Sequence, residues 1–262
     1  MRLLIRVLLL GLLFISCKEE INNRPVNGND TIIKPAVSSN PVAIRGQKWD
    51  VLLIEQIDSV EFYSLKSKVN PAEEKYVSIT DRKLANRMLK GTVSFADYDD
   101  NSNLIPSDSG WIITSIKPRR GSLRTFDKYN EPGFTAYYPE LDILLCEVGH
   151  QLEVSYNLAT GETTENTGNP EEFVTSADKS MRLNGSYDGQ ECNHYFIQVK
   201  EKGHYQRKIP LYDVFEKRMP KGIGICQIDD AFWESNNTLY IKERLVFPNV
   251  YYKVVLVENR RK

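Results

Sequence analysis

The chain has 262 residues, of which 34 are lysine or arginine and 35 are aspartate or glutamate, for a formal net charge of −1. Such a balance gives no electrostatic basis for nucleic-acid binding, which usually shows as a basic excess or stripe. Hydrophobic residues make up 41% of the chain and aromatic residues 10%, so a core of ordinary size can form in one domain.

The N-terminal segment up to Cys17 predicts where the protein resides. Arg2 and Arg6 give a basic start, and residues 7–16 are almost entirely apolar. This layout is typical of a secretory signal peptide, because a membrane-spanning helix needs about 20 apolar residues. We therefore expect a signal peptide over residues 1–16. A membrane span is the alternative to a signal peptide, and an ordinary signal peptide in which Cys17 is incidental is the alternative to a lipoprotein signal.

Phe14-Ile15-Ser16-Cys17 resembles a bacterial lipobox, with Phe14 where leucine is usual. The resemblance implies cleavage before Cys17 and acylation of its thiol, and two or more acyl chains hold a protein stably on a membrane. Lys18-Glu19-Glu20 resembles the tag of surface-exposed lipoproteins of the Bacteroidetes type. We therefore expect an outer-membrane lipoprotein with its lipid anchor at Cys17, and the tag favours exposure at the cell surface. A charged trio that only keeps a tether solvated is the alternative.

Residues 17–48 are predicted to form the lipidated cysteine and a flexible tether. Pro25, Pro35 and Pro41 prevent a continuous helix, and no aromatic residue occurs between Cys17 and Trp49. Within the tether, Asp30-Thr31-Ile32 matches the Asp-Ser/Thr-aliphatic pattern of O-glycosylation sites in Bacteroidetes envelope proteins. Residues 49–262 are predicted to form a single β-rich globular domain.

The hydrophobic pattern predicts an all-β or β-rich domain of irregular antiparallel sheets with one or two short helices. Residues 80–90 are the clearest helix, with Thr80 or Asp81 as its cap and Gly91 after its end. Residues 211–217 fit a second short helix. The main predicted strands are 49–57, 60–65, 91–96, 111–116, 142–148, 151–158, 195–200, 238–245 and 250–257.

Two turn patterns occur in the order found in β-propeller blades. Residues 157–161 read Asn-Leu-Ala-Thr-Gly, and residues 176–179 read Ser-Ala-Asp-Lys, with a fainter repeat of the second pattern at 235–240. The resemblance implies propeller-like hairpins in the C-terminal half. The repeat spacing exceeds the roughly 40 to 50 residues of a common blade, and a closed ring needs about four blades or more.

Besides Cys17, the chain contains Cys146, Cys192 and Cys226. In an oxidising envelope one disulfide can form and leave one free thiol, and Cys192 with Cys226 is the pairing to test. Buried free cysteines are an equal alternative, because cysteine often packs as a small hydrophobic residue.

The chain contains no Gly-rich phosphate loop, nucleophile elbow, His-Glu-x-x-His or Cys-x-x-Cys pattern. His150, with Asp142 and Glu147 nearby in sequence, would fit a general base. Cys192 and His194 share one face of an extended segment and would fit a nucleophile or half of a zinc site. Turn and core roles explain both sets more simply, so we assign no catalytic residue, metal or cofactor.

Residues 97–108 resemble an EF-hand-type calcium loop, because side chains with oxygen atoms recur at alternate positions. Ser102 stands where the sharp turn needs glycine, and Asp108 replaces the bidentate glutamate. An acidic connection between strands is the better interpretation.

Two further features have a binding interpretation. The basic turn 117–121 would suit a phosphate or an acidic glycan, although it is more simply a surface turn. Burial in the core is the better interpretation of several aromatic residues, and a stacking platform for sugars is the alternative; these residues are Trp111, Trp233, Tyr137, Tyr138, Tyr251 and Tyr252.

The anchor, the tether and the lack of a complete catalytic set favour a non-enzymatic envelope lipoprotein that binds an unknown protein or glycan partner. One alternative is a hydrolase of envelope or extracellular glycans or peptides, which would show a deep acidic cleft with two facing carboxylates. A second alternative is an immunity or inhibitor lipoprotein, which would show a strongly charged face complementary to a toxin.

Overall fold

The computed structural model describes residues 48–69, 74–128, 130–149, 151–189, 192–219, 224–244 and 249–259. The predicted signal peptide, the anchor residue Cys17 and the tether up to residue 47, with its glycosylation pattern Asp30-Thr31-Ile32, lie outside these ranges. In the part of the chain that the structure describes, no helix is both long and apolar enough to cross a membrane.

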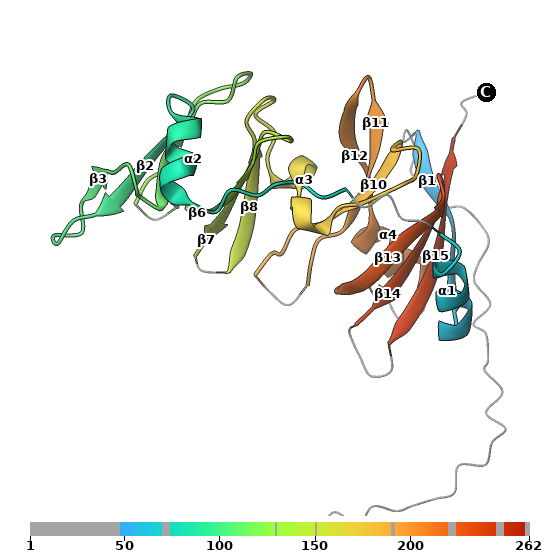
Figure 1. Ribbon diagram of the computed structural model, residues 1–262. Helices are drawn as coiled ribbons and strands as arrows, with labels where there is room; N and C mark the ends of the chain where they lie inside the picture. Colours follow the sequence, from blue (N-terminus) through green and yellow to red (C-terminus); the bar gives the residue numbers. More distant parts are fainter. Residues whose placement is uncertain are drawn as a thin grey trace, which may run out of the picture. The chain divides into compact units, whose positions relative to one another are not determined.

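Antiparallel strands dominate the domain, so the predicted β-rich fold is confirmed (Figure 1). The described strands are β1 (Trp49–Ile57), β2 (Val93–Tyr98), β3 (Leu104–Pro106), β4 (Ile112–Ile116), β5 (Arg124–Thr125), β6 (Gly133–Tyr138), β7 (Ile143–Val148), β8 (Leu152–Asn157), β9 (Val174–Thr175), β10 (Met181–Asn184), β11 (Phe196–Glu201), β12 (His204–Pro210), β13 (Ile228–Ser235), β14 (Thr238–Glu243) and β15 (Val250–Glu258).

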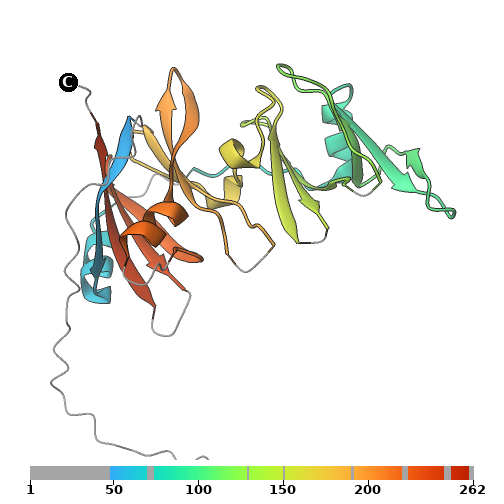
Figure 2. The ribbon, with the colours of Figure 1, turned by 180° about the vertical axis from the view of Figure 1, so that it is seen from behind.

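One sheet joins the first and the last described strands in the order β1-β15-β14-β13. Trp49 lies opposite Glu258 and Ile57 lies opposite Tyr251, so β1 runs antiparallel along the whole of β15. Figure 2 shows the two strands side by side, β1 in blue and β15 in red. This long-range pairing closes the domain, because residues near its start complete a sheet that is formed near its end.

A second sheet has the order β12-β11-β10-β9, a four-stranded antiparallel meander of the type found in propeller blades. The turn between β9 and β10 is held by Asp178, which accepts hydrogen bonds from the backbone of Ser180 and the hydroxyl of Ser176. This sheet shares one hydrophobic core with the sheet of β1, and Trp233 of β13 donates its indole N–H to the carbonyl of Val174 in β9.

The third sheet has the order β3-β2-β4-β6-β7-β8, and β5 pairs with β4. Helix α2 (Arg82–Leu89) packs Ala85 and Leu89 against apolar residues of this sheet. Asp81 caps the helix by accepting a hydrogen bond from the backbone of Leu84, which confirms the helix predicted at 80–90.

The segment 60–65, predicted as a strand, is helical, and that prediction was wrong. Helix α1 (Ser59–Lys66) begins where the Asp58 side chain accepts a hydrogen bond from the Glu61 backbone at 2.8 Å. Phe62 is the buried residue of this helix, while Val60 is 77% exposed. The cap and a single apolar anchor therefore outweigh the strand preference of the local sequence.

Four short α-helices occur among the described residues, more than the one or two that were predicted. The others are α3 (Thr164–Thr167) and α4 (Leu211–Arg218), and the 3-10 helix η1 (Pro170–Glu172) follows α3. Helix α4 confirms the prediction at 211–217, and it buries Leu211, Val214 and Phe215 in the core shared by the first two sheets.

Cys192 and Cys226 form a disulfide bond, as the sequence suggested. Cys146 is free and buried in β7, where burial raises the pKa of its thiol. The disulfide cross-links the segment before β11 to the segment before β13.

Candidate functional site

A pocket with a volume of about 480 Å³ lies beside the exposed indole of Trp111, in the seven-stranded sheet. This volume falls within the range of small-molecule sites. We call it the Trp111 pocket. Its apolar lining includes Ile112 and Phe134, and its polar and aromatic lining includes Arg82, Tyr98, Trp111, Lys128, Glu131 and Glu147.

Trp111 is positioned by the strand pairing around Gly133. The Trp111 carbonyl accepts a hydrogen bond from the Phe134 backbone at 2.6 Å. A Cβ atom added to Gly133 would lie 2.4 Å from Cζ3 of Trp111, so the indole packs directly on this glycine. The Trp111 residue nevertheless keeps 38% of its surface exposed. The sheet thus supports one part of the ring and leaves another open to a ligand.

Two carboxylates line the same pocket. Glu147 lies opposite Gly133 across the β6–β7 pairing. Glu131 accepts a hydrogen bond from the Tyr98 hydroxyl through Oε1, while its Oε2 is buried and accepts no hydrogen bond from the described residues. The unpaired, buried Oε2 costs folding free energy.

Tyr98 stays in its protonated form, because its hydrogen bond to Glu131 raises the pKa of the phenol. The ammonium of Lys128 lies 6.0 Å from the centre of the Tyr98 ring and donates to the Ser102 carbonyl at 3.2 Å. With Arg82 as the second cation, the pocket holds two positive and two negative side chains. Its formal charge is therefore balanced.

Most of the aromatic residues considered for sugar stacking are buried, so the favoured interpretation, a place in the core, is confirmed for them. Trp111 lines the pocket, whereas Trp233, Tyr137, Tyr138 and Tyr252 are buried in hydrophobic cores. Tyr251 is partly buried and packs against the rings of Phe62 and Tyr63 of α1. Tyr137 and Tyr138 are consecutive in β6 and point to opposite faces, and both are buried because a hydrophobic cluster covers each face.

The predicted acid–base set around His150 is divided. His150 lies outside the described residues, and Glu147 lines the Trp111 pocket. Asp142 accepts a hydrogen bond from the Tyr137 hydroxyl at 3.0 Å and forms an ion pair with Arg119. Arg119 belongs to the predicted basic turn 117–121, so its ion pair with Asp142 holds this turn against the sheet.

The predicted pair of Cys192 and His194 is not a thiolate–imidazole pair, because Cys192 is in the disulfide. Nε2 of His194 lies 2.7 Å from a carboxylate oxygen of Asp188, and the His194 ring stacks on Tyr212. Both residues therefore belong to the local structure around the disulfide.

Residues 99–103 connect β2 to β3 as a hairpin, so the preferred interpretation, an acidic connection between strands rather than a calcium loop, is confirmed. Asp99 accepts hydrogen bonds from the backbones of Asn101 and Asn103, and Ser102 has a φ of 60° at the position where glycine was expected. Asp108 lies instead beside α2, in a second pocket that it shares with Asp81 and Asn86. No group of three or more candidate metal ligands is present in the described part of the chain.

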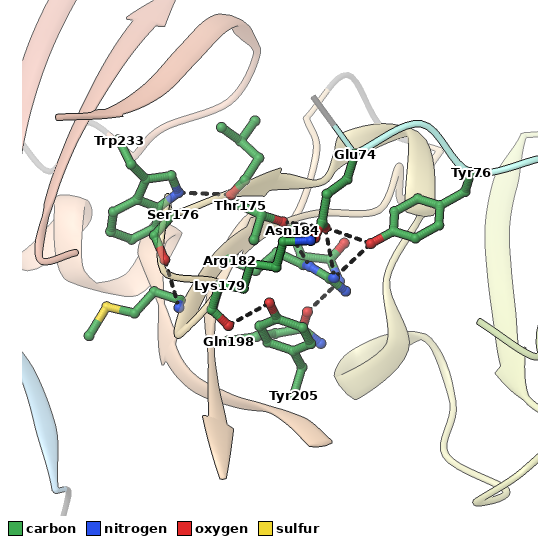
Figure 3. Close-up of polar contacts among 12 residues, drawn as sticks. Glu74, Tyr76, Thr175, Ser176, Lys179, Arg182, Asn184, Gln198, Tyr205 and Trp233 are labelled. Atoms are coloured by element: carbon green, nitrogen blue, oxygen red, sulfur yellow. Dashed lines mark hydrogen bonds and ion pairs between the residues drawn. The ribbon is translucent and has the colours of Figure 1, made fainter. Parts of the chain in front are cut away.

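A buried polar cluster surrounds Arg182 in β10 (Figure 3). Its guanidinium lies between the rings of Phe173 and Tyr205, 4.0 and 3.8 Å from their centres. It donates to Glu74 at 3.2 Å and to the Tyr76 hydroxyl at 3.0 Å. The side chains of Arg182 and Glu74 are only 6% and 13% exposed.

The Glu74 carboxylate is stabilised in its ionised form. Burial alone would raise its pKa, but hydrogen bonds from Tyr76 and Thr175 and the charge of Arg182 outweigh burial and lower the pKa. Ile79, a few residues further on, pairs with Tyr137 of the seven-stranded sheet. The segment 74–79 therefore links the β9–β12 sheet to the seven-stranded sheet, and the Arg182 cluster is structural.

A second, partly buried carboxyl, Glu172, makes a testable contribution to stability. Burial and the charges of Glu153 and Glu171 raise its pKa above 4.5. Because its folded pKa is raised, ionisation of Glu172 costs folding free energy as pH rises above 4.5. We expect Glu172→Gln to stabilise the protein by about 0.5–2 kcal/mol at pH 7 and to have less effect at pH 4. Urea unfolding at both pH values measures this difference, and an equal effect at both would contradict it.

Tyr98, Glu131 and Gly133 were not singled out in the sequence. A glycine at the start of a strand signals close approach of another group, and Gly133 bears this out against Trp111. Arg182 between Met181 and Leu183 offered a comparable signal, because a charged residue inside an apolar strand needs a partner.

Comparison of the chain with protein-family models, with curated proteins and with solved structures finds no match.

Proposed function

We propose that this chain is a non-enzymatic lipoprotein of the cell envelope that is anchored through Cys17 and binds a ligand in the Trp111 pocket. The main support for the binding role is the Trp111 pocket. The exposed rings of Trp111 and Tyr98 and two carboxylates surround a volume of about 480 Å³ beside the seven-stranded sheet.

The envelope location is supported by two independent features. The basic and apolar start before Cys17 has the layout of a lipoprotein signal. The Cys192–Cys226 disulfide is of the kind that persists in oxidising compartments such as the bacterial periplasm and the cell surface.

One observation favours a second candidate, a glycan hydrolase. Glu131 and Glu147 line the same pocket, and glycosidases generally use a pair of carboxylates. Binding remains the first proposal, because Oε1 of Glu131 accepts a hydrogen bond from the Tyr98 hydroxyl. This bond gives Glu131 a structural role in the wall of the pocket.

The binding role is tested by retention of the purified protein on isolated cell envelopes and on insoluble envelope polysaccharide. We expect Trp111→Ala to reduce the retained fraction by about tenfold, since an aromatic contact and its buried area contribute more than about 1.4 kcal/mol. Tyr212→Ala is the matched control, because Tyr212 is also exposed and packs on a glycine, Gly224, but does not line the pocket. Equal retention of both variants and the wild type would contradict the proposal.

Hydrolysis is tested in the same preparations. Release of reducing ends that is lost in both Glu131→Gln and Glu147→Gln would favour the hydrolase. Binding without release supports the non-enzymatic role.

The anchor is tested by metabolic labelling with a radioactive fatty acid, followed by fractionation and by protease treatment of intact cells. We expect the wild type to incorporate the label and to be found with the outer membrane, and Cys17→Ala to do neither. Accessibility to protease in intact cells would indicate exposure at the surface. An unlabelled wild type would contradict the lipid anchor.

A further inference from the structure

We infer that the ligand of the Trp111 pocket is a neutral saccharide, whose pyranose ring stacks on the indole while its hydroxyls donate to Glu131. This inference rests on the proposed binding function and adds the chemical class of the ligand.

The aromatic wall matches one side of a sugar ring. A pyranose presents C–H groups on its face, and an exposed indole offers the apolar, electron-rich surface that such groups contact. Gly133 holds the indole from one side, so the ring is supported before the ligand arrives. Such support lowers the ordering cost of binding.

The carboxylate wall matches the edge of a sugar ring. Glu131 accepts one hydrogen bond, from Tyr98, through Oε1, and a carboxylate oxygen has a second lone pair with which to accept another. An ionised carboxylate only accepts hydrogen bonds, so its complement is a hydroxyl, an amide or an ammonium group. Hydrogen bonds to charged groups are also stronger than neutral ones.

The charge of the pocket separates a hydroxyl from an ammonium. An aromatic pocket with two carboxylates would suit an organic cation. Here, however, Arg82 and Lys128 balance Glu131 and Glu147, and the Lys128 ammonium already lies over the Tyr98 ring. A cationic ligand would meet two positive charges, whereas a neutral polyol carries no charge for them to repel.

The test is isothermal titration calorimetry of the purified protein against neutral oligomers of glucose, mannose, xylose and galactose, and against tetramethylammonium. We expect at least one oligosaccharide to bind, and Trp111→Ala and Glu131→Gln each to weaken it by about tenfold or more. Gly133→Ala should weaken it too, because the added methyl group displaces the indole. Tyr212→Ala should bind as the wild type does. The circular dichroism spectrum of each variant checks that it is folded.

The outcomes are distinguishable. Binding of tetramethylammonium without any saccharide would overturn the sugar class and leave the binding function intact. Saccharide binding that Trp111→Ala and Glu131→Gln do not weaken would overturn the assignment to this pocket. If no probe binds and Trp111→Ala also retains full attachment to cell envelopes, both the sugar class and the proposed function are wrong.

Discussion

Replacing Glu74 by alanine is expected to lower the free energy of unfolding by about 3–5 kcal/mol, because it leaves the buried charge of Arg182 without its carboxylate. The loss of stability comes from leaving the buried Arg182 charge unpaired, more than from losing the attraction between Glu74 and Arg182. Arg182 would keep its contacts with Phe173 and Tyr205, but its charge would remain away from water. Chemical denaturation at pH 7 measures the change.

Two controls separate this explanation from a loss of surface charge. Lys179 also lies 3.4 Å from Glu74, but its side chain is 57% exposed, so Lys179→Ala should cost no more than about 1 kcal/mol. The double variant Glu74→Ala, Arg182→Met removes both charges and should be more stable than Glu74→Ala alone. A double variant that is less stable than the single one would contradict the argument.

The same ion pair predicts a dependence on acid. Because the folded pKa of Glu74 is lowered below 4.5, its contribution is complete above that pH and is lost as pH falls through the folded pKa. The difference in stability between wild type and Glu74→Ala should therefore shrink below about pH 4.

Removing the disulfide is the second large effect. The two cysteines are 34 residues apart, and closing a loop of that length stabilises a fold by about 3–4 kcal/mol in the chain-entropy treatment. We expect the double variant Cys192→Ser, Cys226→Ser to lose that amount in denaturant unfolding. The bond also keeps Asn193 beside Cys226, whose carbonyl accepts the Asn193 N–H at 2.9 Å.

Reduction of the wild type should reproduce the loss seen in the double variant, and reduction of the double variant should change nothing further. A wild type that keeps its full stability in reductant would show that the disulfide does not stabilise the fold.

Local sequence was sufficient to predict some of the elements, including β1, β15, α2 and α4. Residues 80–90 combine a capping aspartate with an apolar stripe, and the helix forms there. Residues 60–65 combine two opposing signals, and the cap at Asp58 prevails over the strand-forming residues that follow it. Local pattern also missed β6, β12 and β13, where no cap competes, so it identified only part of the strands.

The arrangement of the strands could not be predicted in the same way. The partner of β1 is β15, at the other end of the domain, and no local pattern specifies that pairing. The Glu74–Arg182 contact likewise spans 108 residues. Long-range contacts depend on the complementarity of whole surfaces, which one sequence does not display.

The candidate site lies between these two cases. Trp111 was recognisable as an aromatic residue suited to a sugar, but its exposure depends on the pairing that sets Gly133 beneath it. Tyr98 and Glu131 meet only because the seven-stranded sheet brings the end of β2 near the start of β6. Residue types thus suggested the chemistry, and the sheet determined which residues take part.

The most direct test is an NMR titration of the three tryptophan indole N–H signals with the ligand found by calorimetry. Ligand binding in the Trp111 pocket predicts that the Trp111 signal shifts with saturation. The Trp233 signal should stay in place, because its N–H is bonded to the Val174 carbonyl in the core. A saturable shift at Trp233 or Trp49 with none at Trp111 would contradict the account.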